Sequence, residues 1–208
     1  AIIVDFLEVH GLKDACDAVK EKGRMLVVAA PRIFKPGEER LVRYLLKLKP
    51  DALLIRSTGL LWQLTHSEKT QALLEEEQMA LPELWGDFSL NVSNQLAAHQ
   101  LIDLGLSRLA PTHDVNAEQI AALSESLPQA YRDKLELIAH HHLPIFHTEH
   151  CVFARFMSHG NSYKDCGRPC EHHTVHLRDP GQHDHLVLAD VGCRNTVFNA
   201  QAQSAATY

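Results

Sequence analysis

The sequence lacks the segments expected of a membrane or secreted protein and the charge expected of a general nucleic-acid binder. No run approaches the roughly 18 apolar residues of a membrane-spanning helix. The first residues, AIIVDFLEVHG, have neither the basic start nor the cleavage site of a signal peptide. Lys and Arg number 20 against 26 Asp and Glu, and a net charge of −6 argues against a general electrostatic grip on phosphates. We therefore expect a cytoplasmic protein with no membrane segment.

Cysteine is scarce, but its distribution together with that of histidine is uneven. Four of the five cysteines and eleven of the 15 histidines lie between His140 and Cys193. The composition, with 45% apolar and 22% charged residues, is that of a globular chain with one substantial core. We therefore expect a scaffold over residues 1–147 and a cysteine-rich and histidine-rich segment over residues 148–208.

The scaffold part alternates short aliphatic runs with stretches of helical periodicity, a pattern typical of parallel strands joined by helices. Six candidate strands lie within residues 1–9, 24–30, 51–58, 86–93, 107–114 and 135–146. Five helical stretches separate them, with Asn94 a candidate N-cap and Gly105 a candidate stop.

Two architectures produce this alternation, the (β/α)₈ barrel and the doubly wound sheet. No G-x-G-x-x-G motif follows the first strand, so the nucleotide-binding sheet loses its best support. Six strands are too few for a complete barrel, which takes about 250 residues. We therefore expect an α/β fold with an incomplete TIM-barrel-like scaffold, whose open edge is covered by a partner subunit or by a missing upstream segment.

Polar side chains recur after the predicted strands, where barrels place their chemistry. They are Arg32 and Lys35 after the second strand, Arg56 after the third, Asn91 and Asn94 after the fourth, and His113 with Asp114 after the fifth. Asp114, Asn94 and Asn116 could instead cap helices. The recurrence makes His113 and Asp114 candidate catalytic residues.

Three consecutive histidines end the sixth predicted strand. Strand alternation places His140 and His142 on one face and His141 on the other, so the three cannot all bind one ion. A general base, a hydrogen bond to substrate, a metal ligand and a structural hydrogen bond all remain open for His140 and His142.

The strongest signal is the spacing of four cysteines, with one close pair and two distant singles. Disulfides would suit a secreted protein, and buried thiols or a zinc site are further alternatives. Zinc sites commonly use two close pairs, so this spacing suits a bulkier iron–sulfur cluster as well or better. The four residues are Cys151, Cys166, Cys170 and Cys193. Cys16 lies in a predicted helix among alanines, and we expect it to be an inert buried thiol.

Arginines stand close to these cysteines in sequence. Four thiolates around a centre of charge +2 leave a net −2, which needs cations or hydrogen bonds to offset it. Arg168 and Arg194 adjoin presumed ligands and are candidate cluster-binding residues, whereas Arg155 and Arg178 are expected to be solvated.

Residues 143–179 and 189–205 resemble the cysteine-bearing segment of the collagenase-like peptidase U-32 family, and residues 6–23, 31–61 and 86–105 resemble its barrel portion. The resemblance implies a TIM-barrel-like fold, and family members are implicated in oxygen-independent hydroxylation of RNA bases or of a ubiquinone precursor's ring. Some hold a [4Fe–4S] cluster, which by position would fall on these four cysteines. The family glutamate would correspond to Glu149, although HHHLPIFHTEHC departs from the family's usual apolar–His–Gly stretch.

Three functions are compatible with these features. The first is an iron–sulfur enzyme that hydroxylates an RNA base or a small aromatic substrate, with His140, His142, Glu149, His113 and Asp114 positioning it. The second is a metal-dependent collagenase-like peptidase with Glu149 as general base, although HTEH separates its histidines by three rather than the four of H-E-x-x-H. The third is a zinc-clasped, non-catalytic module of a larger protein.

Overall fold

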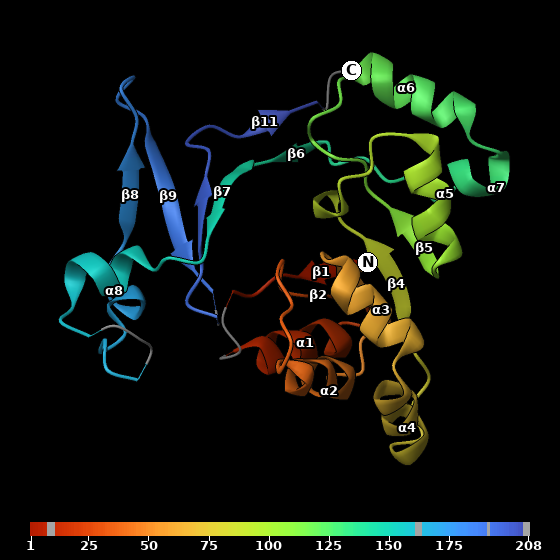
Figure 1. The fold of residues 1–208 in the computed structure, drawn as a ribbon, viewed down its shortest axis with the longest axis horizontal. Helices are drawn as coiled ribbons and strands as arrows, with labels where there is room; N and C mark the ends of the chain where they lie inside the picture. Colours follow the sequence, from red (N-terminus) through yellow and green to blue (C-terminus); the bar gives the residue numbers. More distant parts are fainter. Residues whose placement is uncertain (8–10, 161–163, 191, 206–208) are drawn as a thin grey trace. The chain divides into compact units, whose positions relative to one another are not determined.

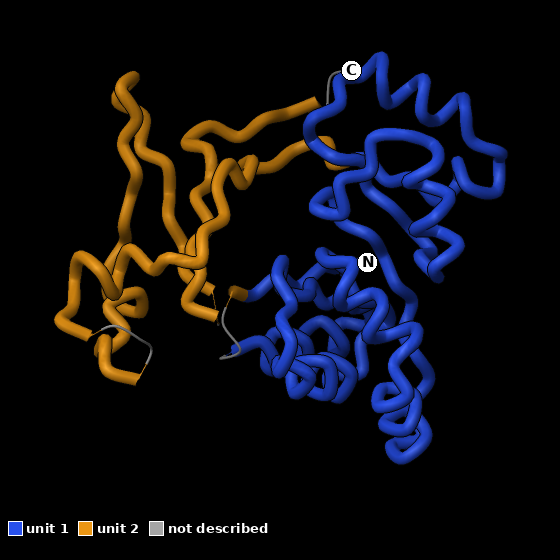
Figure 2. The backbone as a smooth tube through the Cα atoms, in the orientation of Figure 1, with its two compact units in different colours: residues 1–6, 10–137 blue, residues 7–9, 138–208 orange. Residues whose placement is uncertain are grey.

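The structure is a computed structural model that describes residues 1–7, 11–160, 164–190 and 192–205. The chain divides into two compact units (Figure 2). Unit 1 comprises Ala1–Phe6 and His10–Leu137, and unit 2 comprises Leu7–Val9 and Ile138–Tyr208. Within the described ranges, every helix is too short or too polar to cross a membrane.

Unit 1 is built on a parallel sheet of five strands in the order β1-β2-β3-β4-β5 (Figure 1). Each strand therefore pairs with the next one along the chain, without the reversal of order that defines a doubly wound sheet. The strands are β1 (Ile2–Val4), β2 (Leu26–Ala29), β3 (Ala52–Ile55), β4 (Glu83–Gly86) and β5 (Leu106–Leu109).

Helices pack on one face of this sheet. Leu26, Val28, Leu53 and Ile55 alternate along β2 and β3 and join one buried cluster with apolar residues of the helices. The opposite face has a separate small cluster around Trp85. The helices of unit 1 are α1 (Leu12–Glu21), α2 (Glu39–Lys47), α3 (Thr58–His66), α4 (Glu68–Glu76), α5 (Gln95–Asp103), α6 (Ala117–Ser126) and α7 (Gln129–Arg132), with a 3₁₀ turn η1 (Phe88–Leu90).

Local sequence explains where two of these helices begin and end. The Asn94 side chain accepts a hydrogen bond from the Ala97 amide at the start of α5, and Gly105, at φ 111°, follows its end. Asn116 and Gln119 exchange reciprocal hydrogen bonds in a capping box that opens α6. Asn94 and Asn116 are therefore helix caps.

Unit 2 is built on an antiparallel sheet in the order β7-β10-β9-β8. Its strands are β7 (Pro144–Thr148), β8 (Val175–Arg178), β9 (Asp184–Ala189) and β10 (Asn195–Phe198), and a short pair joins β6 (His140–His141) to β11 (Gln203–Ser204). Helix α8 (Val152–Met157) contacts the 3₁₀ turn η2 (Pro169–Glu171). The buried core consists of Phe153, Val187 and Val197.

The expected α/β class with a parallel sheet is confirmed, but barrel closure is not shown: β1 and β5 each have one strand partner in the described sheet. The sixth predicted strand was wrong. Leu135 makes a single bridge to Leu109, and the following residues form β6 and β7, which pair antiparallel with residues late in the chain. That pairing is long-range, so the local apolar pattern of residues 135–146 does not encode it.

Candidate functional site

A network of charged side chains joins the carboxyl ends of three strands of unit 1. The Arg56 guanidinium, just after β3, donates from Nη1 and Nη2 to the two carboxylate oxygens of Asp5, at 2.9 and 2.6 Å. Its Nε donates to Asp87 Oδ2 at 2.8 Å. Asp5 follows β1 and Asp87 follows β4, so the ion network links strand ends that are distant in sequence.

Two side chains of this ion network are largely shielded from water, which strengthens the attraction between their charges. The side chains of Arg56 and Asp87 are 19% and 6% exposed. Burial lowers the pKa of Arg56, but hydrogen bonds and charges from Asp5 and Asp87 outweigh it and raise that pKa above its usual value. Arg56 is therefore a permanently charged residue whose hydrogen-bond donors are directed at two carboxylates.

A second arginine, Arg32, lies beside the network and differs from Arg56 in its contacts and in the direction of its pKa shift. Its guanidinium carbon lies 5.8 Å from the centroid of the Phe88 ring. Burial lowers the pKa of Arg32, the charge of Arg56 lowers it further, and Asp87 partly offsets both. Among the described residues, Arg32 has no hydrogen-bond or ion-pair partner.

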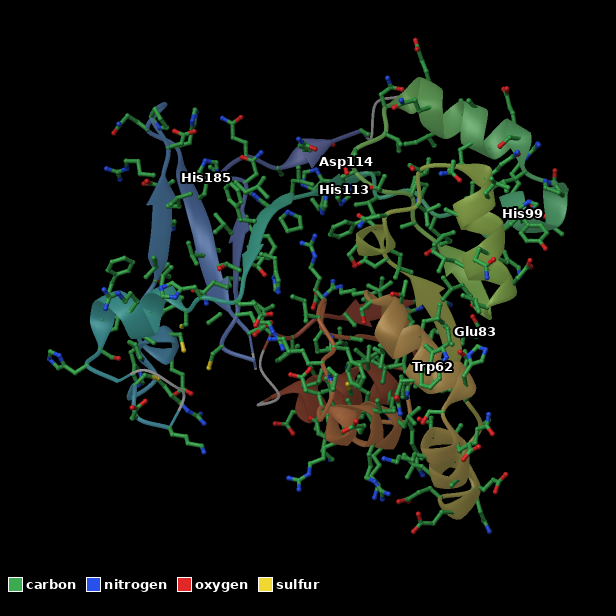
Figure 3. The ribbon with its side chains drawn as sticks, in the orientation of Figure 1. Trp62, Glu83, His99, His113, Asp114 and His185 are labelled. Atoms are coloured by element: carbon green, nitrogen blue, oxygen red, sulfur yellow. The ribbon has the colours of Figure 1, made fainter. Side chains whose placement is uncertain are left out.

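His113 and Asp114 lie on the same unit, after β5 (Figure 3). The His113 ring packs against Phe88 with centroids 4.1 Å apart and planes inclined by 35°. Asp114 is exposed and accepts a hydrogen bond from the Thr112 hydroxyl at 3.2 Å. The structure thus places His113 beside Phe88 at the carboxyl edge of the sheet, while the catalytic roles of His113 and Asp114 stay predictions.

Sequence reasoning missed Asp5 and Asp87 as partners at this edge. The fourth strand was expected within residues 86–93, whereas β4 ends at Gly86 and Phe88–Leu90 form a 3₁₀ turn. Asp87 caps that turn by accepting from the Phe88 amide at 2.8 Å, and Asn91 adopts a left-handed conformation at φ 58°. Asp5 and Asp87 fall inside the strands predicted over residues 1–9 and 86–93, so only the shorter β1 and β4 of the structure reveal that both follow strand ends.

Unit 2 contains the four candidate metal-binding cysteines, and all four are free thiols of intermediate exposure. The disulfide alternative is therefore not seen in the structure. Cys151 precedes α8, and Cys170 lies in η2, which contacts α8. Cys151 and Cys170 both pack against the core cluster that contains Phe153, so two of the four sulfurs share one end of this unit.

Hydrogen-bond donors approach two of the sulfurs. Asn195 is fully buried, and its amide group donates to Cys151 Sγ at 3.8 Å while accepting from the Val152 amide at 2.7 Å. The backbone amide of Arg168 donates to Cys166 Sγ at 3.4 Å. Such donors stabilise thiolates, as hydrogen bonds to metal-bound sulfur do.

Cys193 and Arg194 connect the same region to Glu149. Cys193 has φ 58° and directly precedes Arg194, two residues before Asn195. The Arg194 side chain is 4% exposed, and its Nε donates to Glu149 Oε1 at 3.2 Å. A buried guanidinium therefore lies next to Cys193 in sequence, as expected for a cation that offsets thiolate charge.

Arg168 differs from Arg194. Its side chain is 61% exposed and pairs with Glu171 at 2.9 Å. Its contribution near sulfur comes from its backbone amide, because Arg168 adopts a left-handed conformation with φ 52° before Pro169. The cluster-binding role of the Arg168 side chain stays a prediction.

The donor set suits a metal centre, although its geometry does not define one. Within the described ranges, no group of three His, Cys, Asp or Glu side chains is arranged to hold a single ion. Free thiols with amide donors and a nearby buried cation are nevertheless the chemistry that a thiolate-bound cluster requires.

The predicted histidines of unit 2 make specific hydrogen bonds. The His142 ring Nδ1 lies 2.8 Å from the Asn199 carbonyl oxygen, which can only accept, so Nδ1 carries the proton. His140 lies in β6 and pairs with Ser204 in β11. His147 contacts the Thr196 hydroxyl at 2.9 Å, and β7 ends at Thr148. Residues 144–148 form a strand, so HTEH lacks the helix on which H-E-x-x-H binds zinc.

A histidine and aspartate cluster in the β8–β9 hairpin was not predicted. Asp179 Oδ2 lies 3.0 Å from His183 Nδ1 and 3.4 Å from His185 Nε2. The Ala200 amide donates to His185 Nδ1 at 3.1 Å, so the proton of this buried ring sits on Nε2, the nitrogen that faces Asp179. His185 and His183 both contact the Asp179 carboxylate, and these hydrogen bonds stabilise the hairpin.

Comparisons with known proteins add little to this geometry. The solved structure of the U32 peptidase Mk0906 matches with a TM-score of 0.47 and 15% identity, over 66% of this chain and 58% of that chain. This chain thus spans less than two thirds of that protein's length. No protein-family model and no curated protein matches the chain. This similarity is too low to assign an activity.

Proposed function

We propose that unit 2 binds a [4Fe–4S] cluster through Cys151, Cys166, Cys170 and Cys193. The chain would then be part of an oxidoreductase of the peptidase U-32 type, which hydroxylates an RNA base or a similar aromatic ring without molecular oxygen. When bound, the cluster would supply electron transfer. The support is the presence of four free thiols in a unit with a very small core.

The size of that core is the observation on which the proposal rests. Among the residues that the structure describes, Phe153, Val187 and Val197 form the buried apolar cluster of unit 2, and only partly buried side chains such as Ile145 and Val175 pack against them. Units of about 70 residues usually need disulfides, a metal or a partner to be stable. The four cysteines form no disulfide, so a metal centre is the crosslink that the residues of unit 2 themselves can provide.

The charge of such a centre would be offset locally. Asn195 donates to Cys151, the Arg168 amide donates to Cys166, and the buried Arg194 guanidinium adjoins Cys193. Hydrogen-bond donors and cations near sulfur offset the negative charge of metal-bound thiolates, and their presence supports the proposed centre.

The carboxyl edge of unit 1 is the proposed substrate-binding region, with His113 and Asp114 among its residues. His140, His142 and Glu149, which belong to unit 2, stay proposed catalytic residues. The order of β1 to β5 is that of consecutive strands in a (β/α) barrel. Ile2 and Ile3 on the edge strand are 43% and 48% exposed, and we propose that a partner subunit or an upstream segment pairs with this edge.

Anaerobic purification with iron and sulfide analysis tests the cluster. We expect about four irons and four sulfides per chain, a brown protein, and loss of both in Cys170→Ser. The matched control is Cys16→Ala, because Cys16 lies in α1 and burial raises the pKa of its thiol, which makes it an unreactive residue. Stoichiometric zinc without iron would instead favour the zinc-clasped module, and protein without any metal would refute both.

A further inference from the structure

Arg32 has the properties of a ligand-binding residue that the cysteine centre does not explain. It lies after β2, at the carboxyl edge of a parallel sheet, where such sheets bind ligands. In its neighbour Arg56, by contrast, each of the three guanidinium nitrogens already donates to Asp5 or Asp87. Arg32 has no such partner among the residues that the structure describes.

Because Arg32 is partly buried, the difference in hydrogen-bond partners between Arg32 and Arg56 affects its free energy. Arg32, Phe88 and His113 are all partly buried, so each is shielded from water yet keeps surface that a ligand can reach. A desolvated guanidinium without an acceptor is unfavourable, whereas a bidentate carboxylate satisfies it with two parallel hydrogen bonds. The two carboxylates nearby do not serve this purpose, since both bind Arg56.

The neighbouring rings indicate what else the ligand contains. Phe88 lies under the Arg32 guanidinium, and His113 packs against Phe88 at 4.1 Å. Aromatic pairs of this kind offer an edge or a face to a further planar ring. A ring attached directly to a carboxylate would extend from Arg32 along these two side chains.

The local charge limits the ligand to a small anion. Arg32 and Arg56 balance Asp5 and Asp87, so these four groups are neutral together. The Asp5 side chain is 44% exposed, Asp114 is also exposed, and the chain has a net charge of −6. A polyanion such as RNA would meet these carboxylates over its whole length, whereas a monoanion meets chiefly Arg32.

From this juxtaposition we infer that Arg32, with Phe88 and His113, forms a binding subsite for a small aromatic monocarboxylate. The inference rests on the proposed function only in naming the substrate class, and it selects an aromatic acid over an RNA base. The subsite lies entirely within unit 1, so its binding can be measured whether or not iron is present.

Benzoate is the probe, and its binding to the full chain is measured by ligand-observed NMR titration. We expect benzoate to bind, benzamide and cyclohexanecarboxylate to bind at least tenfold more weakly, and inorganic phosphate to compete poorly. Arg32→Gln should weaken benzoate binding at least tenfold. Arg32→Lys should restore only part of the binding, because lysine keeps the positive charge but cannot donate two parallel hydrogen bonds to a carboxylate. Phe88→Leu should weaken benzoate more than acetate.

The control variant is Arg40→Gln, which removes an exposed arginine of α2 and should leave binding unchanged. Thermal unfolding verifies that each variant is folded. Benzoate binding that is absent, or that survives Arg32→Gln in a folded protein, overturns the inference. So does an RNA oligonucleotide that binds through Arg32 more tightly than benzoate. Iron content decides the cluster separately, so iron-free protein that binds benzoate through Arg32 would refute only the cluster.

Discussion

The two units of this chain are stabilised by different means. In unit 1 one buried cluster draws on all five strands and on the helices that cover them. In the described part of unit 2 the buried apolar cluster is Phe153, Val187 and Val197, and polar residues such as Arg194 and Asn195 are buried as well. Apolar burial can therefore account for the folding of unit 1, whereas the proposed metal centre would supply stability that the small apolar core of unit 2 lacks.

This difference bears directly on function. A rigid sheet is a suitable support for a binding edge, because the strands that position Asp5, Arg56 and Asp87 are themselves fixed by the core. A unit whose stability depends on a bound centre instead couples its structure to that centre. Perturbing one unit should therefore leave the other largely intact.

The largest effect is expected from removing two of the cysteines. In Cys166→Ser/Cys170→Ser, unit 2 should lose its hydrogen-exchange protection, because the binding free energy of a structural metal, on the order of 10 kcal/mol, becomes folding free energy in a small unit. Unit 1 should keep its protection. Hydrogen exchange with mass spectrometry reads both units in one sample. Equal protection of β9 and β10 in variant and wild type would show that unit 2 needs no bound centre.

A smaller effect, confined to the other unit, is expected from Leu53→Ala. Leu53 is 0% exposed in the centre of the sheet, and its truncation should lower the free energy of unfolding of unit 1 by about 3 kcal/mol. Leu96→Ala in α5, where the side chain is 75% exposed, is the matched control and should change it by less than about 0.5 kcal/mol. Iron content should be the same in both variants. Loss of iron from Leu53→Ala alone would mean that the units are not independent.

The sequence was most informative about unit 1, because its signals are local. Alternating aliphatic residues located β2 and β3, and Asn94 and Asn116 marked helix starts through hydrogen bonds to residues three positions away. The error at β4 has a local cause as well. Asp87 and Phe88 belong to a capped 3₁₀ turn, although GDFSLNVS reads as an alternating strand.

Unit 2 was less predictable, because its contacts join residues far apart in sequence. Antiparallel pairing brings Thr148 opposite Asn195, and a side-chain hydrogen bond joins Asn195 to Cys151. The cysteine spacing indicated a candidate centre but not the Arg194–Glu149 ion pair, which links residues 45 positions apart. The Asp5–Arg56–Asp87 network of unit 1 was missed for the same reason, since each partner follows a different strand.

The smallest expected effect concerns the β8–β9 hairpin, where Asp179 adds to the stability of unit 2. The His183 amide and imidazole bind Asp179 and lower the pKa of its carboxyl from its usual value to about 2. A carboxyl with a depressed pKa in the folded state contributes stability above its unfolded value, and the contribution disappears as pH falls from about 4 to about 2. Asp179→Asn should therefore increase hydrogen exchange in β8 and β9 at pH 6, and the difference from wild type should shrink by pH 3. Glu125→Gln, an exposed change in α6, should alter neither, and a difference that does not depend on pH would mean that the ionised carboxylate is not what holds the hairpin.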